Sequence, residues 1–325
     1  MFMVEELTLT TLTMQVAAIR KLTDRIAELE LTMPGGEALP AWQPGAHVRV
    51  SLPEGGDRAY SLIAFDAARQ DGGYRIAVQL EPEGLGGSRF MHGLKVGDTL
   101  TVSPPKCDFP LDAKSPTLLL AGGIGITPMI AMAHRLHAIG ADFAMHYSVK
   151  SREAAGYLDD LANVPWHDRV YVHVTAEGTR ADLDHALSGY EPGWHVYTCG
   201  PDRYMQGVTQ AAERQGFPEE ARHLEYFSVP ELPEWENHPF RLKLAKSGRE
   251  FLVQEDQTAA DVLNENGFHI DIKCSDGICG VCKCGLVSGE VEHRDFVLSK
   301  KQRETAIILC QSRAAEDGGI IEIDL

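Results

Sequence analysis

The sequence of 325 residues lacks a hydrophobic run long enough to cross a membrane. Such a run needs about 18 apolar residues, and the best candidate, Thr117–Ala133, is interrupted by three glycines and a proline. The N-terminus also lacks a positive start, since no basic residue precedes Arg20. A secretory signal requires such a start before its apolar core. The sequence therefore predicts a cytoplasmic protein without a membrane segment.

Positive charge is scarce as well. The chain has 30 lysines and arginines against 47 aspartates and glutamates, which gives a net charge of −17. Proteins that bind nucleic acid neutralise its phosphates with clustered Lys and Arg, so we expect no nucleic-acid partner. An acidic surface keeps a protein soluble and can steer a basic protein toward it.

Cysteine is nearly absent before residue 274, where only Cys107 and Cys199 occur. Disulfide frameworks are rare in a reducing cytoplasm, whereas clustered thiols in such a protein indicate a metal site. The C-terminal part is therefore predicted to bind metal. The other five of the seven cysteines lie there, at Cys274, Cys279, Cys282, Cys284 and Cys310.

The chain divides into stretches of different pattern, which predict a multidomain protein. In residues 1–112, short alternating runs such as His47–Leu52 and Arg75–Leu80 are separated by glycine-rich turns. This is typical of an antiparallel β-barrel. In residues 113–228, apolar runs such as Phe143–Val149 alternate with helices expected at 128–139, 154–162 and 204–215. That alternation predicts an α/β domain with a parallel sheet.

The last stretch follows residues 229–238, a segment rich in proline and glutamate that we expect to be a linker. Residues 239–325 contain two strand-like runs, at 240–245 and 250–253, and a final one at 320–325. A helix at 258–266 should end at Gly267. The mixture predicts an α+β domain.

A C-x4-C-x2-C spacing, with one more cysteine further along the chain, is the strongest signal in the sequence. It is the ligand pattern of plant-type [2Fe–2S] clusters. Two irons need four thiolates, and a tight loop supplies three of them. Gly277 and Gly280 should let the loop turn its N–H groups toward the sulfurs. The predicted metal ligands are Cys274, Cys279, Cys282 and Cys310.

A zinc site is the alternative for these thiols. Structural zinc sites usually combine two C-x2-C pairs, and this chain has one, Cys279 and Cys282, so the cluster is favoured. Cys284 is a fifth cysteine for four positions. Its spacing places it on the other face of a following strand, and we expect it not to be a ligand.

A glycine-rich run from Gly122 to Pro128, GGIGITP, follows an apolar strand and precedes a helix. Glycines let a pyrophosphate approach the backbone, and the helix N-terminus offers unpaired N–H groups. Thr127 is predicted to be the N-cap and Pro128 the first helical residue. The run can also be a simple strand–helix turn, and its departure from G-x-G-x-x-G disfavours a Rossmann dehydrogenase.

A second turn, Cys199-Gly200-Pro201, follows the strand expected at 194–198. Open α/β sheets bind ligands beyond the carboxyl ends of their strands. Cys199 alone can equally be a buried core thiol. Two glycine turns at strand ends of one sheet predict a dinucleotide site more strongly than either turn alone.

The first stretch contains Arg58-Ala59-Tyr60-Ser61 at the start of a strand. Tyr60 can stack on a flavin, Ser61 can hydrogen-bond its reactive edge, and Arg58 can hold phosphate with its planar fork. Gly86-Gly87-Ser88 predicts a concavity of backbone N–H groups for phosphate. Alone, R-x-Y-S is more often an accidental strand pattern.

R-A-Y-S, G-G-I-G-I-T-P and C-G-P in this order resemble the ferredoxin–NADP⁺ reductase superfamily. With the C-terminal cysteine pattern, the whole chain resembles the phthalate dioxygenase reductase family, which includes vanillate O-demethylase reductases. The resemblance implies a flavin-binding β-barrel, a nucleotide-binding α/β domain and a β-grasp ferredoxin domain. It also implies FMN and a [2Fe–2S] cluster as cofactors, NADH as substrate, and a Rieske-type oxygenase as protein partner.

The same resemblance implies roles for single residues. Cys199 matches a cysteine near the reacting nicotinamide carbon, and Phe227, in the segment 223–227 that closes the nucleotide domain, is expected beside the flavin. The predicted catalytic residues are Ser61, Thr127, Cys199 and Phe227. The predicted cofactor-binding residues are Arg58, Tyr60, Ser61, Gly86, Gly87, Ser88, Gly123, Gly125, Thr127, Pro128, Cys199, Gly200 and Pro201. Lys150-Ser151-Arg152 leaves NADPH open, because these residues can also bind its 2′-phosphate.

Together the three modules predict an electron-transfer oxidoreductase. NADH gives up two electrons as hydride and a [2Fe–2S] cluster accepts one, so a flavin is needed between them. One alternative is an FAD-dependent reductase of a di-iron hydroxylase, in which the ferredoxin module usually comes first. Another is a redox-sensing module, although the sequence shows no DNA-binding or receiver element.

Overall fold

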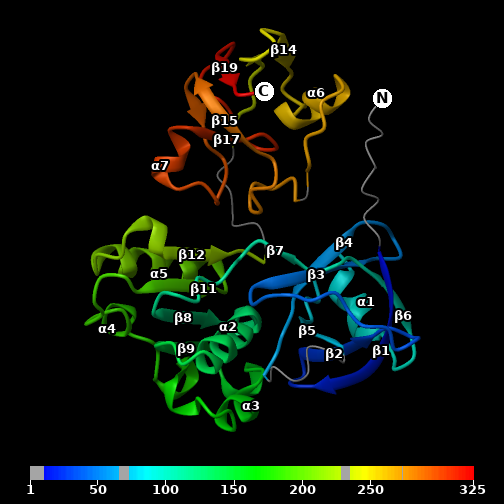
Figure 1. The fold of residues 1–325 in the computed structure, drawn as a ribbon, viewed down its shortest axis with the longest axis vertical. Helices are drawn as coiled ribbons and strands as arrows, with labels where there is room; N and C mark the ends of the chain where they lie inside the picture. Colours follow the sequence, from blue (N-terminus) through cyan, green and yellow to red (C-terminus); the bar gives the residue numbers. More distant parts are fainter. Residues whose placement is uncertain (1–10, 66–72, 228–234, 273) are drawn as a thin grey trace. The chain divides into compact units, whose positions relative to one another are not determined.

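The computed structural model describes residues 11–65, 73–227, 235–272 and 274–325. They fall into two compact units, Met1–Phe227 and Ser228–Leu325 (Figure 1). Of the linker expected at 229–238, residues 229–234 lie outside the described residues. None of the described helices is both long enough and apolar enough to span a bilayer.

The first unit begins with an antiparallel barrel in strand order β4-β3-β6-β1-β2-β5, with β7 paired to β3. Alternate side chains such as Val16, Leu29 and Leu31 are fully buried, because one face of each strand points into the barrel. The amide of Ile63 donates to the carbonyl of Arg75 at 2.9 Å, which joins the two edges. The strands are β1 (Leu12–Lys21), β2 (Ile26–Thr32), β3 (Ala46–Ser51), β4 (Asp57–Ser61), β5 (Tyr74–Gln79), β6 (Thr99–Val102) and β7 (Lys106–Cys107).

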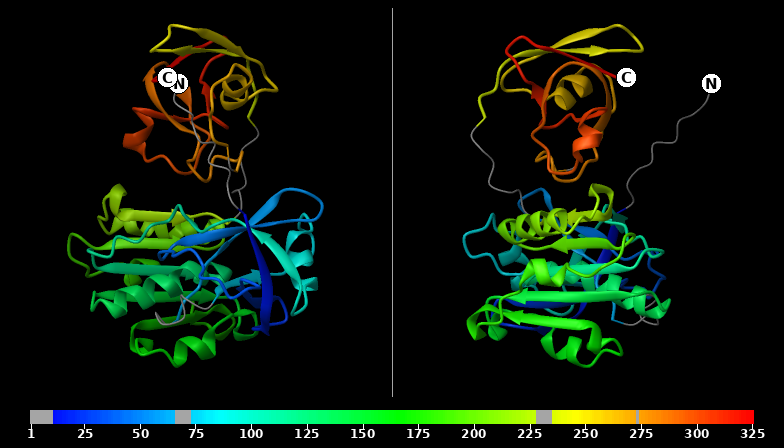
Figure 2. Two further views of the ribbon diagram at one scale, coloured as in Figure 1. Left: turned by 45° about the vertical axis from the view of Figure 1, so that its right-hand side comes forward. Right: turned by 90° about the vertical axis from the view of Figure 1, so that its left-hand side faces the viewer.

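A parallel sheet follows, in strand order β10-β9-β8-β11-β12. Helices cover both of its faces (Figure 2): α2 and α3 pack on one hydrophobic core, and α4 and α5 on the other. The order reverses between β8 and β11, where open α/β sheets bind ligands. The elements are β8 (Thr117–Gly122), α2 (Ile126–Ala138), β9 (Phe143–Val149), α3 (Leu158–Ala162), β10 (Val170–Val174), α4 (Leu183–Ala186), β11 (His195–Cys199), α5 (Asp202–Arg214) and β12 (Arg222–Glu225).

Barrel and parallel sheet share one core within the first unit. Ile63 and Phe109 pack in the same buried cluster as Met129 of α2. Beside this cluster, the hydroxyl of Tyr157 donates to the Glu28 carboxylate at 2.8 Å. Because these contacts are buried, the two parts are held in a fixed relation.

Our expectations for the helices of this unit need two corrections. The helix expected at 154–162 is wrong in its first half, since Arg152–Ala154 forms a 3₁₀ turn and α3 begins at Leu158. Tyr157 between them has a φ of 66°, a left-handed conformation that interrupts a helix. Helix α1 (Gly87–Gly93), which follows the glycine pair of the barrel, was not expected.

The second unit contains a mixed sheet in strand order β14-β13-β19-β15-β17, with the β-grasp arrangement that we expected. Helix α6 (Ala259–Glu265) packs on it through Ala260 and Leu263. Gly267, with a φ of 86°, follows the end of α6, as predicted, whereas Thr258 is the N-cap of this helix and not its first residue. The remaining elements are β13 (Phe240–Leu244), β14 (Glu250–Val253), β15 (Lys283–Ser288), β16 (Val291–Glu292), α7 (Lys300–Arg303), β17 (Ala306–Ile308), β18 (Arg313–Ala314) and β19 (Ile320–Ile323).

Candidate functional site

The two glycine turns of the parallel sheet meet at its reversal point. A Cβ added at Gly125 would lie 2.2 Å from the carbonyl oxygen of Cys199, and one added at Gly200 would lie 2.9 Å from Cα of Gly122. Side chains cannot fit at these distances, so the two turns pack backbone against backbone. We call this surface, formed by Gly122, Gly125 and Gly200, the glycine platform.

Thr127 and Pro128 lie beside the platform but not in the capping positions that we expected. The N-cap of α2 is Gly125, because the 3₁₀ turn Gly123–Gly125 runs directly into the helix. Thr127 is buried in the first turn and its hydroxyl donates to the carbonyl of Ile124 at 3.1 Å. Pro128 lies in the first turn of α2. The N–H groups of a first turn have no hydrogen-bond partner within the helix, so a proline, which has no N–H, loses nothing at this position.

Cys199 ends β11 in the hydrophobic core under the platform, with no exposed surface. Burial raises the pKa of its thiol well above the ordinary value, and the nearby Glu225 carboxylate adds to the rise. The sulfur is therefore a neutral thiol at physiological pH, suited to packing and not to attack as a thiolate.

Two further polar residues line the same edge of the sheet and were missed in the sequence. A Cβ at Gly122 would lie 2.9 Å from both Pro201 Cδ and Tyr204 Cδ1, so the Tyr204 ring packs on the platform. Burial raises the pKa of Tyr204 to about 12, which the Ser148 hydroxyl partly offsets. Ser148 is paired with Gly122 across β9 and β8. No local motif marks either residue; only the strand order brings them here.

In the barrel, the structure brings the two phosphate-binding candidates together. A Cβ at Gly87 would lie 2.9 Å from Cγ and 3.3 Å from Nε of Arg58. Gly86 has a φ of 90° and α1 begins without a side-chain cap, so its first N–H groups stay available. A guanidinium beside free backbone N–H groups fits a phosphate group.

Ser88 is already engaged within this loop. Its hydroxyl accepts the amide of Glu81 at 2.9 Å and donates to the carbonyl of Glu81 at 3.4 Å. These bonds fix the conformation of the loop that carries Gly86 and Gly87. A part in phosphate binding stays a prediction for Ser88.

Tyr60 and Ser61 lie side by side on β4, opposite Val48 and His47 of β3. Ser61 is buried, and burial raises the pKa of the Tyr60 hydroxyl to about 12. Strand β5 of the barrel contacts both β4, which carries Tyr60 and Ser61, and the Gly123–Gly125 turn. Phe227 follows β12 with 45% of its surface exposed, and its place beside a flavin stays a prediction.

In the second unit, the four predicted cysteine ligands form two interacting pairs. Hydrogen bonding from Cys279 lowers the pKa of Cys274, and hydrogen bonding from Cys310 lowers that of Cys282. Cys310 also contacts Cys274 and so connects the pairs. All four thiols are thus connected by contacts, and four thiolates are the ligand set of a plant-type [2Fe–2S] cluster.

The loop that carries three of these cysteines curls as its glycines predicted. Gly277 has a φ of 72° and Gly280 a φ of 71°. The amide of Asp276 donates to the sulfur of Cys274 at 3.4 Å. Such N–H groups stabilise thiolates and cluster sulfurs.

A second segment supports this loop and was not recognised in the sequence. The amide of Phe296 donates to the carbonyl of Gly277 at 3.1 Å. Asp295 holds the segment in place, because its carboxylate accepts the amides of Val297 and Leu298 at 3.2 and 2.8 Å. The signal in the sequence was Asp295, whose carboxylate binds the amide two residues later. Such local turns are too common to be recognised as part of a cluster site.

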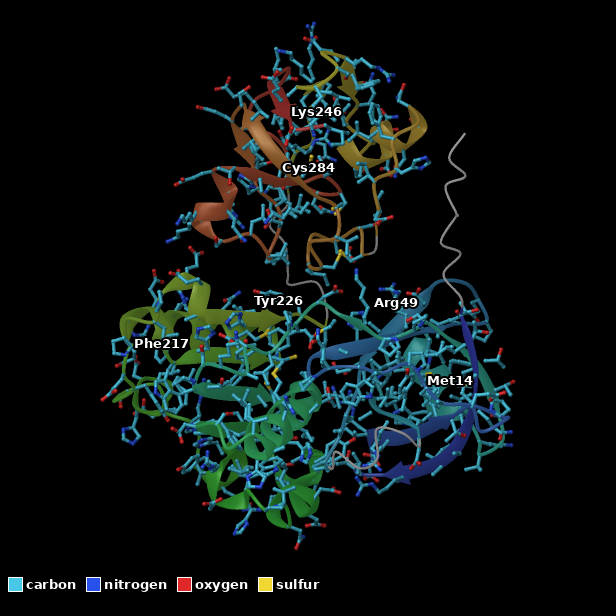
Figure 3. All side chains as sticks on the ribbon, in the orientation of Figure 1. Met14, Arg49, Phe217, Tyr226, Lys246 and Cys284 are labelled. Carbon is cyan, nitrogen blue, oxygen red and sulfur yellow. The ribbon has the colours of Figure 1, made fainter. Side chains whose placement is uncertain are left out.

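Cys284 lies on β15 (Figure 3). The groups that influence its thiol are Asp324 and Lys246, not the other cysteines, and burial raises its pKa. Among the described residues, no three His, Cys, Asp or Glu side chains converge to hold a single metal ion. The C-x4-C-x2-C spacing favours a plant-type cluster over a mononuclear zinc site.

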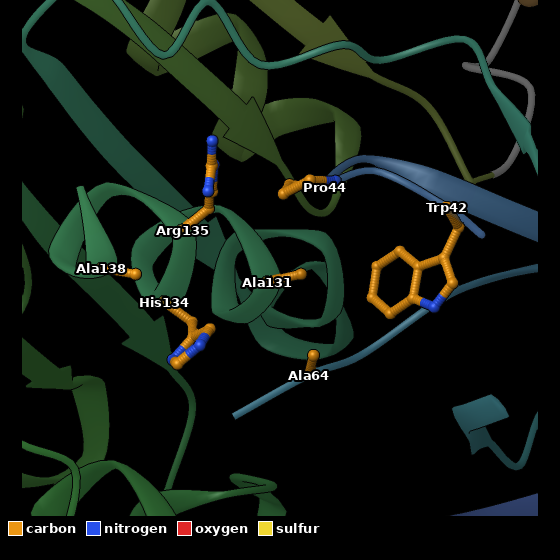
Figure 4. A pocket seen from close by; sticks show the side chains of 7 residues that line it. All are labelled: Trp42, Pro44, Ala64, Ala131, His134, Arg135 and Ala138. Atoms are coloured by element: carbon orange, nitrogen blue, oxygen red, sulfur yellow. The ribbon is translucent and has the colours of Figure 1, made fainter. Parts of the chain in front are cut away.

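The barrel and α2 also enclose a cavity of about 120 Å³ (Figure 4). Ligand pockets usually measure about 300–1,000 Å³, so this cavity is too small for a flavin or a dinucleotide. None of the residues predicted for the site line it. Its walls are Trp42, Pro44, Ala64, Ala131, His134, Arg135 and Ala138.

Comparison with known proteins agrees with this geometry. Residues 242–315 match the family described as the 2Fe-2S iron-sulfur cluster binding domain. The chain is 35% identical over 308 residues to phthalate dioxygenase reductase of Burkholderia cepacia, covering 93% of this chain and 94% of that protein. Fold and site therefore define an oxidoreductase that transfers electrons with a flavin and a [2Fe–2S] cluster.

Solved structures extend the likeness to the fold. A structure described as phthalate dioxygenase reductase, a modular structure for electron transfer from pyridine nucleotides to [2Fe–2S], is 34% identical, covers 97% of this chain and 98% of its own, and superposes with a TM-score of 0.67. An intact type IV self-sufficient cytochrome P450 monooxygenase is 35% identical over 97% of this chain, with a TM-score of 0.81, and this chain spans 41% of it. The chain belongs to the phthalate dioxygenase reductase family.

Proposed function

We propose that the chain is the cytoplasmic reductase component of a Rieske-type aromatic-ring oxygenase or O-demethylase. It takes hydride from NADH onto FMN and passes single electrons through its [2Fe–2S] cluster to the oxygenase. The observation that carries the proposal is the coexistence of the glycine platform, the Arg58–Gly87 cradle and the paired cysteines in one chain.

A flavin accepts a hydride and releases electrons singly, which is what a one-electron cluster requires. The residues of this chain position the groups for that exchange. The glycine platform lets a pyrophosphate approach the backbone, Tyr60 offers its ring to the flavin, and Ser61 offers a hydroxyl. The neutral thiol of Cys199 fills the core beneath the glycine platform. No acid or base is needed for hydride transfer.

FMN, the smaller flavin, is supported by the cradle at the barrel. Arg58 and the start of α1 converge on one position, as a terminal phosphate requires. Releasing the flavin and identifying it by chromatography tests this assignment. FMN is the expected result; FAD would keep the mechanism and overturn the cofactor assignment.

A Rieske partner is favoured by redox potential. Plant-type clusters lie near roughly −400 mV and Rieske centres between roughly −150 and +300 mV, so electrons flow downhill. A haem monooxygenase is the second candidate, because the self-sufficient cytochrome P450 monooxygenase carries a similar region within its own chain.

Reconstitution separates these partners. The purified reductase and NADH are mixed anaerobically with either a Rieske oxygenase component or a cytochrome P450 haem domain, and reduction is followed by stopped-flow absorbance. We expect rapid bleaching of the Rieske centre and slow reduction of the haem. Reduction of the haem alone would reject the Rieske assignment and retain the reductase.

A further inference from the structure

The segment Lys150–Arg152 lies at the carboxyl edge of the parallel sheet, one strand away from the glycine platform. Strands β8 and β9 are adjacent, and Ser148, two residues before Lys150, pairs with Gly122. A dinucleotide whose pyrophosphate lies on the platform extends along this edge. Its adenosine ribose therefore reaches the end of β9.

Arg152 is not free at this edge, because it is bound by Glu177. Its Nε and Nη2 donate to the two carboxylate oxygens of Glu177 at 2.7 and 3.2 Å. This is the paired, fork-like geometry that a guanidinium also uses for phosphate. The carboxylate thus occupies the position on Arg152 that a phosphate would take.

The backbone fixes where the two partners stand. Glu177 belongs to a 3₁₀ turn, Thr175–Glu177, directly after β10. The amide of Ala176 in that turn donates to the carbonyl of Lys150 at 2.9 Å. The segments after β9 and β10 are therefore tied together, and the pair does not depend on two long side chains meeting by chance.

The charges at this edge cancel. Lys150 and Arg152 contribute two positive charges, and Glu153 and Glu177 contribute two negative ones. Two hydrogen bonds lower the pKa of the Glu153 carboxyl. The first comes from the backbone N–H of Glu153 itself, and the second from the hydroxyl of Ser151. These four side chains together therefore carry no net charge.

We propose that the Arg152–Glu177 pair makes the site selective for NADH by excluding the 2′-phosphate of NADPH. This rests on the proposed hydride transfer from a nicotinamide nucleotide. A 2′-phosphate carries about −1.5 to −2 charges and meets a carboxylate that is already bound to the guanidinium fork of Arg152. The 2′-hydroxyl of NADH carries no charge and can donate to Glu177. Selectivity then arises from a repulsive element as well as an attractive one.

The test replaces the carboxylate by a neutral group of the same shape, Glu177→Gln. The probes are 2′,5′-ADP, which carries the 2′-phosphate, and 5′-AMP, which lacks it, each titrated calorimetrically into the full-length protein. We expect the affinity for 2′,5′-ADP to rise about five- to tenfold, the scale of one exposed charge contact, and that for 5′-AMP to change less than about twofold. The KM for NADPH should fall in parallel while kcat stays the same.

Two variants control for indirect effects. Asp184→Asn removes the carboxylate from the pair Arg214–Asp184, which has the same geometry at 3.0 and 2.8 Å. Arg214 lies at the far end of α5, about 18 Å from its start beside the platform, so this variant should leave both affinities unchanged. Adding Arg152→Ala to Glu177→Gln should abolish the gain for 2′,5′-ADP.

The outcomes separate the inference from the function on which it rests. If wild-type protein is reduced by NADH but Glu177→Gln keeps the wild-type ratio of 2′,5′-ADP to 5′-AMP affinity, the inference is wrong and the function stands. Wild-type protein that prefers NADPH also overturns the inference. If neither nucleotide reduces the flavin, the proposed function itself fails.

Discussion

The nucleotide site and the cluster site both depend on glycines, but they use them differently. At the glycine platform, residues 125 and 200 must be glycines because the backbones of the two turns lie too close together for a side chain to fit between them. At the cluster loop, Gly277 and Gly280 are required by a left-handed backbone between cysteines that belong to no helix or strand. The first site is formed by packing, and the second by its ligands.

This difference has a thermodynamic consequence. A platform made by buried strands persists without its ligand, so little conformational entropy is lost when the ligand binds. A loop whose conformation is set by four thiolates gains much of its stability from the metal, since metal binding to such a site is also folding free energy. The two sites should therefore respond differently to loss of what they bind.

The largest expected effect is at Cys310, which connects the two cysteine pairs. Cys310→Ser should abolish electron transfer to cytochrome c or a Rieske partner while NADH still reduces the flavin, because only the cluster is lost. Cys284→Ser, on the neighbouring strand, should transfer electrons at the wild-type rate. A Cys310→Ser protein that NADH no longer reduces would contradict the separation of the two sites.

Removing the metal should destabilise only the second unit. After chelation under reducing conditions, calorimetry should show the transition of Ser228–Leu325 at a lower temperature, by a shift of several degrees, because the cluster contributes to its folding. The transition of Met1–Phe227 should stay where it was. Equal shifts in both transitions would mean that the units unfold together.

A methyl group at Gly125 breaks the platform directly. Gly125→Ala places carbon 2.2 Å from a carbonyl oxygen, and the turn must move, at a cost of about 1–3 kcal/mol for overpacking. The KM for NADH should rise at least about tenfold. Gly93→Ala is the matched control, since its added Cβ meets nothing within 4 Å, and its kinetics should match wild type. An unchanged KM in Gly125→Ala would remove the platform from nucleotide binding.

The smallest expected effect is at Tyr60. Loss of an aromatic stack costs about 0.5–1.5 kcal/mol, so Tyr60→Ala should weaken flavin binding by at most about tenfold, measured by fluorescence of released flavin. Tyr60→Phe keeps the ring and should retain the flavin. Equal affinity in all three proteins would show that the ring does not stack on the flavin.

Local chemistry explains which features were predictable from the sequence. The barrel, the parallel sheet and the helix end at Gly267 follow from periodicity and from residues with one strong conformational preference. The start of α2 did not, because Thr127 looks like a cap and only the preceding 3₁₀ turn makes Gly125 the N-cap.

Long-range contacts explain what could not be predicted. Tyr204 reaches the platform through strand order, and Asp295 supports the cluster loop from a segment 16 or more residues beyond Cys279. Glu177 meets Arg152 because two strand ends are adjacent. Each of these depends on topology, which no short motif encodes.

Anaerobic titration of the purified protein with NADH, followed by visible absorbance, tests the central claim most directly. We expect a flavin band with an iron–sulfur shoulder, both bleached by NADH in sequence and poorly by NADPH. A colourless protein that contains zinc, or a coloured one that NADH leaves unchanged, would contradict it.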